Sequence, residues 1–211
     1  RTSNFTKIAQ ITFAILPCGL TRVKDIVENL KNFSLETTEG VQIVDICAVC
    51  HQLITLISAQ YSTPQYKFEC ELEKVEVMGN PGPLKQALMN VMINAAQAIE
   101  DRGFIKLTVL DSPTLVTIKI LDSGCGIPTK HLKRVFEPFF TTKPEGQGQG
   151  LGLSVAYTAI EQHQGKISIS SKEAKGTVVE ITIPKQPAAQ PPSSEDNEEN
   201  KENEAENSQT A

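Results

Sequence analysis

The chain has 211 residues, with 39% hydrophobic and 5% aromatic side chains, which allows one full domain and a small additional segment. Its formal net charge is −5, but the last 27 residues carry seven acidic side chains against two lysines, so the rest of the chain is neutral. A neutral folded part gives no reason to expect a nucleic-acid-binding surface, and we expect no nucleic-acid partner.

The first 37 residues are predicted to be helical, with an interruption at Pro17–Gly19. Beyond it, apolar residues recur at intervals of three, four and three: Leu20, Val23, Val27 and Leu30. This seam suits pairing with another helix, and an ordinary core-facing helix has the same spacing, so both alternatives stay open. The apolar run Ile11–Leu16 is too short to span a bilayer, and no signal peptide is visible. We expect a cytoplasmic protein, with membrane attachment only through a segment upstream of Arg1.

A second helix is predicted over Ile43–Ala59, because its apolar residues fall on one face. That face consists of Ile46, Cys50, Leu53 and Ile57. Residues 47–51 read Cys-Ala-Val-Cys-His, which also matches the pattern of covalent haem attachment. Five cysteines at irregular spacing predict reduced thiols rather than a disulfide framework, and we interpret Cys47 and Cys50 as core residues.

A row of amides distinguishes the third predicted helix, Leu84–Ile99, which follows a strand predicted over residues 66–73. The helix is apolar nearly all round except for one stripe: Gln86, Asn90, Asn94 and Gln97. Residues at these spacings share one side of a helix. A buried amide left unpaired costs roughly 1–3 kcal/mol. The stripe therefore predicts either a wall that holds a ligand, with Asn94 as a Mg²⁺ ligand, or a helix edge that faces water.

Two strands, predicted over residues 105–110 and 116–121, form a hairpin that leads into Asp122. The turn that follows has glycine at positions 124 and 126. A carboxylate at a strand end can accept a hydrogen bond from an exocyclic amine, and glycines let the backbone approach a flat ring closely. A plain Asp-Ser-Gly turn is the alternative.

A glycine-rich segment, residues 146–153, runs directly into a helix predicted over residues 151–162. Free N–H groups at a helix start, together with the helix dipole, favour bound phosphate. Thr141, Thr142 and Lys143 add hydroxyls and a positive charge just before it. A flexible linker and an ordinary surface loop are the alternatives for these two segments.

Two final strands, predicted over residues 166–171 and 177–183, complete the folded part. The fold class that follows is α+β, with helices on one side of a largely antiparallel sheet. From Lys185 onward the composition is rich in Pro, Gln, Ser, Asn and Glu, which predicts a disordered acidic tail over residues 185–211.

Four blocks in this order resemble the N, G1, F and G2 boxes of the sensor histidine kinase catalytic domain. They are Asn90–Asn94, Asp122–Gly126, Phe136–Phe140 and Gly148–Leu153, and Gly176-Thr177 resembles the small G3 box. The resemblance covers residues 38–184, and the strings at 94–99 and 139–143 are most similar to the nitrogen-regulator-like subgroup. It implies a two-layer α/β sandwich of the Bergerat type that binds ATP, preceded at residues 1–37 by part of a dimerisation helix.

The resemblance also implies a role for each block at a site for ATP and Mg²⁺. Asp122 would read the adenine amine with Thr177 nearby, and Asn94 would hold the metal. Asn90 would line the phosphates, Lys143 would contact the triphosphate, and these two would act in catalysis together with Asn94. The full expected cofactor-binding set is Asn90, Asn94, Asp122, Gly124, Gly126, Ile127, Phe139, Thr141, Thr142, Lys143, Gly148, Gly150, Leu151, Gly152, Leu153 and Thr177.

The implied reaction is transfer of the ATP γ-phosphoryl group to a histidine on a dimerisation helix outside this chain. The implied parent is a two-component sensor kinase that forms a homodimer through its N-terminal helix and acts on a response-regulator receiver domain. Residues 136–150 would form a mobile lid. Related ATPases carry Glu, as general base, where this chain has Asn90. Asn cannot accept a proton at neutral pH, which favours transfer to an already nucleophilic imidazole.

The chain departs from the family pattern in a few places. Gln149 stands where Thr or Ser is usual, and Gln164 stands where Gly is common. None of the three histidines (His51, His131 and His163) precedes Leu20, where the family places its acceptor. This motivates a second hypothesis, a nucleotide-binding dimer or adaptor that signals through lid closure without chemistry. A related ATPase or protein-serine kinase is a third.

Overall fold

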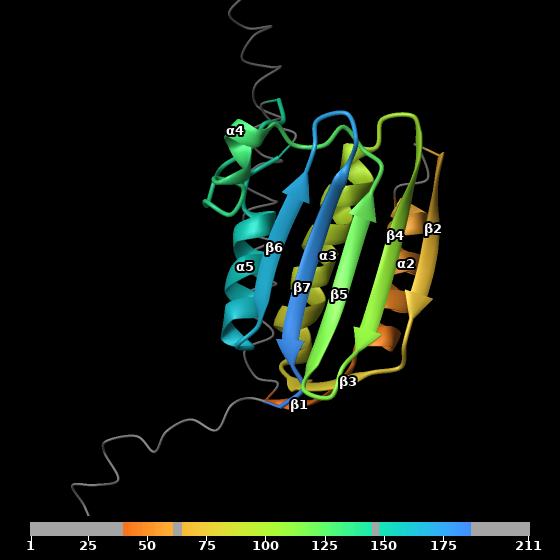
Figure 1. Cartoon of the computed structure of the whole chain (residues 1–211), viewed down its shortest axis with the longest axis vertical. Helices are drawn as coiled ribbons and strands as arrows, with labels where there is room; N and C mark the ends of the chain where they lie inside the picture. Colours follow the sequence, from red (N-terminus) through yellow and green to blue (C-terminus); the bar gives the residue numbers. More distant parts are fainter. Residues whose placement is uncertain (1–39, 61–64, 145–147, 187–211) are drawn as a thin grey trace, which may run out of the picture.

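The structure is a computed structural model that describes residues 40–60, 65–144 and 148–186. The predictions for the helical segment 1–37 and for nearly all of the acidic tail lie outside these residues. The described part is a two-layer α+β sandwich, in which helices cover one face of a five-stranded sheet (Figure 1). The predicted fold class is confirmed.

The large sheet has the order β2-β4-β5-β7-β6. Its strands are β2 Gln65–Leu72, β4 Arg102–Asp111, β5 Leu115–Asp122, β6 Lys166–Ser171 and β7 Thr177–Pro184. The β2–β4 pair is parallel and the other three pairs are antiparallel. The predicted β4–β5 hairpin is confirmed, and it ends with Asp122 opposite Thr177 on β7.

A second, two-stranded sheet pairs β1, Gln42–Asp45, with β3, Glu76–Gly79, in antiparallel fashion. The prediction of helix from Ile43 was therefore wrong, because α2 spans Ile46–Gln60 and the residues before it form β1. The Asp45 carboxylate accepts a hydrogen bond from the Ala48 N–H at 2.9 Å, which caps the start of the helix. Sequence reasoning missed β3 altogether.

The longest helix, α3, spans Pro81–Ala98 and begins three residues before the predicted start. Asn80 is its N-cap, since its side-chain oxygen accepts from the Gly82 N–H at 3.2 Å. Proline is well suited to the first turn of a helix, where its missing N–H is not needed. A single-turn helix, α4 Thr129–Leu132, was not predicted, whereas α5, Gly152–Gln162, agrees with the prediction.

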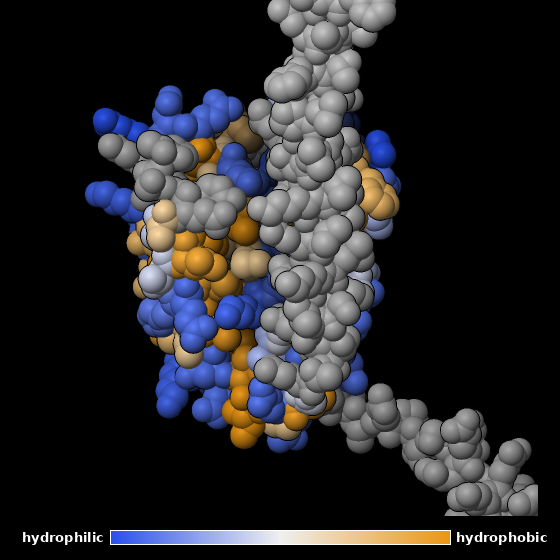
Figure 2. Space-filling model, turned by 180° about the vertical axis from the view of Figure 1, so that it is seen from behind, coloured by the Kyte–Doolittle hydropathy of each residue, from blue (hydrophilic) through white to orange (hydrophobic). Residues whose placement is uncertain are grey.

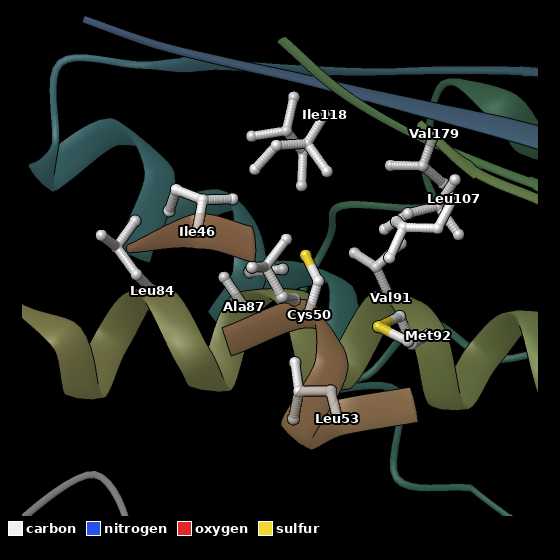
Figure 3. Packing of buried hydrophobic residues seen from close by; sticks show 14 of the residues in the cluster. Ile46, Cys50, Leu53, Leu84, Ala87, Val91, Met92, Leu107, Ile118 and Val179 are labelled. Carbon is white, nitrogen blue, oxygen red and sulfur yellow. The ribbon is translucent and has the colours of Figure 1, made fainter. Parts of the chain in front are cut away.

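The hydrophobic core lies between the helical layer and the large sheet (Figure 3). The face predicted for α2 is confirmed, because Ile46, Cys50, Leu53 and Ile57 are all fully buried. Burial raises the pKa of the Cys50 thiol to about 12, which keeps it protonated at neutral pH. Cys50 is therefore an inert packing residue, as predicted.

The outer side of the helical layer carries both apolar and hydrophilic side chains. On the part of this side that is open to view, apolar groups run from the middle of the face to its lower edge, with hydrophilic groups beside them (Figure 2). Leu56 and Tyr157 are the exposed large hydrophobic residues of α2 and α5, at 49% and 37% exposure. Within residues 40–60, 65–144 and 148–186, no helix is long and apolar enough to cross a bilayer.

A histidine joins the end of α5 to the start of α3. His163 Nε2 accepts from the Asn80 N–H at 2.9 Å, and Nδ1 lies 2.7 Å from the Ala159 carbonyl oxygen. Since Nε2 accepts, Nδ1 must carry the hydrogen and donate to Ala159. The ring packs closely on Gly79, where an added Cβ would come within 2.6 Å of it. The neutral imidazole thus fixes the relative position of the two helices.

Replacing His163 with phenylalanine keeps the ring but removes both hydrogen bonds. The Asn80 N–H then loses its acceptor in a half-buried place, so we expect unfolding free energy to fall by about 1–3 kcal/mol. Urea unfolding followed by circular dichroism measures this. His51→Phe is the matched control, because His51 is exposed and its hydrogen bonds to other described residues stay within its own helix. Equal stability of the two variants would contradict this role for His163.

Candidate functional site

The amides of α3 lie against the first turn of α5. A Cβ placed on Gly152 would be 3.7 Å from Asn90 Cβ and 3.8 Å from Asn94 Nδ2. Gln86 Nε2 donates to Asn90 Oδ1 at 3.1 Å, so the row is internally hydrogen bonded. The two predicted segments therefore meet, and together they present amide groups and the free N–H groups of a helix start.

The carboxylate turn packs on the C-terminal end of the same helix. The Cys125 N–H donates to the Ala98 carbonyl oxygen at 2.9 Å. Gly124 lies so close that an added Cβ would come within 2.5 Å of that oxygen. α3 is therefore one wall shared by the amide row, the α5 start and the turn that follows β5.

Asp122 is buried, with 4% of its surface exposed. Its Oδ1 accepts from the Gly124 N–H at 2.8 Å. Burial raises the pKa of the carboxyl, and hydrogen bonds from the Gly124 and Thr177 backbone N–H groups act in the opposite direction. Backbone N–H groups thus hold the carboxyl group, whose oxygens can accept further hydrogen bonds.

The turn after Asp122 is also fastened to the β6–β7 connection. The Ala174 N–H donates to the Cys125 carbonyl at 2.7 Å, and the Ile127 N–H donates to Ser171 Oγ at 2.8 Å. Gly126 has a φ of +69°, and an added Cβ would lie 2.2 Å from the Lys172 carbonyl oxygen. Thr177, at 7% exposure, follows this connection.

Lys143 links the segment before α5 to α3. Its ammonium donates to Gln97 Oε1, the last amide of the α3 row. Burial lowers the pKa of this lysine, which indicates a partly desolvated cation. Such a cation favours a bound anion, because an anion would offset the loss of hydration.

Two more of the expected residues, Thr141 and Gly148, lie around Lys143. Thr141 Oγ1 accepts from the Lys143 N–H at 3.2 Å, and an added Cβ on Gly148 would lie 3.1 Å from Lys143 Cδ. Thr142 is exposed. Gly150, at φ +69°, abuts the Phe139 backbone, while the Phe139 side chain is 74% exposed.

Most of the expected site residues therefore lie in two groups along α3. One group holds Asn90, Asn94, Leu151 and Gly152, and the other holds Asp122, Gly124, Gly126, Ile127 and Thr177. Lys143, Thr141 and Gly148 lie beside the Gln97 end of the row. The side chains of Phe139 and Thr142 point to solvent, and Leu153 packs against the core instead.

The family model described as "Histidine kinase-, DNA gyrase B-, and HSP90-like ATPase" matches residues 79–187, which is half of the chain. The chain belongs to this family. The catalytic domain of histidine kinase ThkA superposes on it with a TM-score of 0.62 at 33% identity, covering 70% of this chain and 97% of that domain. The fold and family are those of a histidine kinase catalytic domain.

Longer histidine kinases are also similar to this chain. Sensor histidine kinase ZraS of Escherichia coli K12 is 34% identical over 165 residues, which cover 77% of this chain and 35% of ZraS. Histidine kinase ThkA in complex with response regulator protein TrrA has a TM-score of 0.66 at 28% identity, covering 83% of this chain and 51% of that chain. The chain thus spans about a third of the length of ZraS.

Sequence reasoning missed one polar residue of this histidine kinase domain. Ser171 ends β6, and its hydroxyl contacts Ile127, Gly176 and Thr177. A signal was present, because alternation places Ser171 on the same face as the partly or fully buried Ile167 and Ile169. A single serine in that apolar series indicates a hydroxyl turned inward.

Proposed function

We propose that the protein binds Mg·ATP and transfers the γ-phosphoryl group to a histidine on a dimerisation helix, as the catalytic part of a two-component sensor kinase. The observation that supports this best is the arrangement along α3. Asn90 and Asn94 lie against the glycine-initiated start of α5, and the buried Asp122 lies beyond the C-terminal end of the same helix. A polar wall between a carboxylate and a helix start suits an adenine nucleotide. The adenine amine donates hydrogen bonds and suits the carboxylate, and the phosphates are negatively charged and suit the helix start.

The Asp122 end suits the adenine. Its carboxylate already accepts two backbone N–H groups and has capacity for the exocyclic amine. Gly124, Gly126 and Ile127 would offer backbone to the ring, and Thr177 would lie at its edge. The close backbone packing at the two glycines leaves no room for a Cβ there.

The α5 end suits the phosphates. The N–H groups of residues 150–153 would bind phosphate oxygens at a helix start, where the dipole adds to the attraction. Asn90 would line them, and Lys143, together with Thr141, would come from the lid. The exposed Phe139 and Thr142 would reach the nucleotide only after the lid moves.

Mg²⁺ would be held by Asn94 and the phosphates. The donor set fits this ion, because Mg²⁺ binds amide and phosphate oxygens and usually keeps several waters. Within the described ranges, no cluster of three or more His, Cys, Asp or Glu could hold a metal alone. When bound, the ion would neutralise charge on the phosphate oxygens.

Asn90 favours transfer of the phosphoryl group to a protein acceptor over hydrolysis of ATP. An amide cannot take a proton from water at neutral pH, so the site has no general base at this position. A histidine acceptor needs none, since a neutral imidazole is already a nucleophile. The chain's contribution is then to position the phosphates and to stabilise their charge.

The proposed partners follow from the same reaction. A second copy of the protein would pair through the N-terminal helix, and the receiver domain of a response regulator would take the phosphoryl group. ThkA, which is 28% identical, has been solved with a response regulator. The strings at residues 94–99 and 139–143 support placement in the nitrogen-regulator-like subgroup, and we propose that the domain acts in the cytoplasm.

Radiolabel transfer tests this proposal. The chain is incubated with Mg²⁺, γ-labelled ATP and a separate dimeric helical hairpin that carries an exposed histidine. We expect label on the hairpin in an acid-labile, base-stable form, the behaviour of phosphohistidine, and none on a hairpin whose histidines are replaced by alanine. Steady phosphate release with an unlabelled hairpin would show an ATPase and would overturn the kinase proposal.

A further inference from the structure

The hydroxyl of Ser171 lies where three segments meet: the end of β6, the turn after β5 and the start of β7. Three polar atoms lie within hydrogen-bonding distance of Ser171 Oγ. They are the Ile127 nitrogen at 2.8 Å, the Gly176 carbonyl oxygen at 2.8 Å and Thr177 Oγ1 at 3.0 Å. A serine hydroxyl has one hydrogen and two lone pairs, so these three partners use its whole capacity.

The direction of each bond follows from this count. The Gly176 carbonyl can only accept, so Ser171 must donate its one hydrogen there. The Ile127 N–H can only donate, and it fills one lone pair of Ser171 Oγ. Thr177 must then donate its hydroxyl hydrogen to the other lone pair. Only lone pairs remain on Thr177 Oγ1 for any other group.

The backbone prevents Gly176 from turning away. Its φ is +90°, and an added Cβ would lie 1.9 Å from the Asp122 carbonyl oxygen, so the residue is confined against the end of β5. The Lys172 N–H also donates to the Gly176 carbonyl at 3.3 Å. The group that takes the Ser171 hydrogen is therefore fixed, and the direction of the Thr177 hydroxyl is fixed with it.

Thr177 lies beside Asp122. The two residues are Cα partners on adjacent strands, and both are at least nine-tenths buried. An ionised carboxylate also has no hydrogen to donate. Two neighbouring groups that only accept favour a ligand edge that donates, such as an amine, and oppose an oxo group, which would bring a third acceptor.

We propose that Ser171 determines purine specificity by holding the Thr177 hydroxyl as an acceptor, so that the site selects a 6-amino purine nucleotide over a 6-oxo one. Ser171 acts through Thr177 and is a positioning residue. The proposal rests on the nucleotide-binding function proposed above, with adenine at the Asp122 end.

The test compares ATP with inosine triphosphate, which carries oxygen in place of the amine and a hydrogen on N1 in place of a lone pair. Dissociation constants come from isothermal titration calorimetry with Mg²⁺ present. The wild-type chain should prefer ATP. In Ser171→Ala the Thr177 hydroxyl can turn and donate to the oxygen of inosine triphosphate. We therefore expect the preference, the dissociation constant of inosine triphosphate divided by that of ATP, to fall at least about 5-fold, as the loss of one opposed pair of polar groups predicts.

Two matched variants distinguish the positioning role of Ser171 from a general loss of stability. Ser170→Ala, at the exposed neighbouring position, should keep the wild-type preference, and Ser171→Thr, which retains a hydroxyl, should restore it. Thr177→Val removes the acceptor itself and should also lower the preference, which covers the case in which Ser171→Ala does not fold. Unchanged preference in a folded Ser171→Ala or Thr177→Val would overturn the proposal. A wild-type chain that bound neither nucleotide would contradict the nucleotide-binding function itself. Tight ATP binding with an unchanged preference in the variants would contradict only the role of Ser171.

Discussion

Asp122→Asn is expected to lower ATP affinity by about 100-fold or more. The variant replaces an acceptor-only carboxylate with an amide, whose NH₂ group would face the adenine amine and place donor against donor. The amide oxygen can still accept from the Gly124 N–H, so the turn itself should persist. Isothermal titration calorimetry with Mg·ATP measures the loss.

Thermal stability distinguishes this effect from unfolding. Burial raises the pKa of the Asp122 carboxyl, which means that the folded state disfavours the ionised form more than the unfolded chain does. At neutral pH the charge therefore costs stability, and its removal should leave the melting temperature unchanged or slightly higher. Asp111→Asn, at the other end of the β4–β5 hairpin, is an exposed control that should bind ATP normally. ATP binding by Asp122→Asn at wild-type strength would remove Asp122 from the site.

Asn94→Ala is expected to reduce phosphoryl transfer by at least about 100-fold, a loss typical of removing one group that stabilises transferring phosphate charge. The side chain lies against the start of α5, where it would hold Mg²⁺ beside the phosphates. Affinity for ATP measured in EDTA should change little, because the adenine end is untouched. The gain in affinity on adding Mg²⁺ should disappear.

Radiolabel transfer and calorimetry with and without Mg²⁺ give these two quantities. Lys85→Ala is the matched control, since Lys85 is an exposed residue of the same helix. A variant that lost affinity equally with and without Mg²⁺ would show that Asn94 contacts the nucleotide directly or supports the fold. A variant with full transfer activity would exclude it from catalysis.

The elements that sequence reasoning predicted well are those with strong periodicity. The α2 face and the amide row of α3 both follow helical spacing over several turns. The structure buries the α2 face and places Asn90 and Asn94 together beside Gly152. The strands β4 to β7 alternate over six or more residues and end at turn residues. In these segments, local pattern and tertiary burial agree.

The elements that were missed depend on partners far away in sequence. β1 and β3 have four residues each, and neither strand exists without the other. Four residues are too few for alternation to distinguish a strand from a helix start, so residues 43–45 were assigned to α2. The single turn of α4 contains no buried residue and left no apolar signal.

The parts of the proposed site follow from glycine spacing and from the amide stripe. These patterns predicted that Asn94, Asp122 and the α5 start serve one nucleotide, but not that α3 is the element along which all three lie. Ser171 was missed because its role lies in contacts with residues 127, 176 and 177, which only the folded sheet brings together.

The parallel pairing of β2 with β4 has a consequence for how the domain folds. Gln65 pairs with Arg102, and the chain between them contains β3 and all of α3. Closing so large a loop is entropically costly, so this pairing should form late, after the local β4–β5 hairpin. The helix with the amide row is the crossover that this pairing closes. A newly made chain should therefore acquire affinity for its ligand only in the last stage of folding.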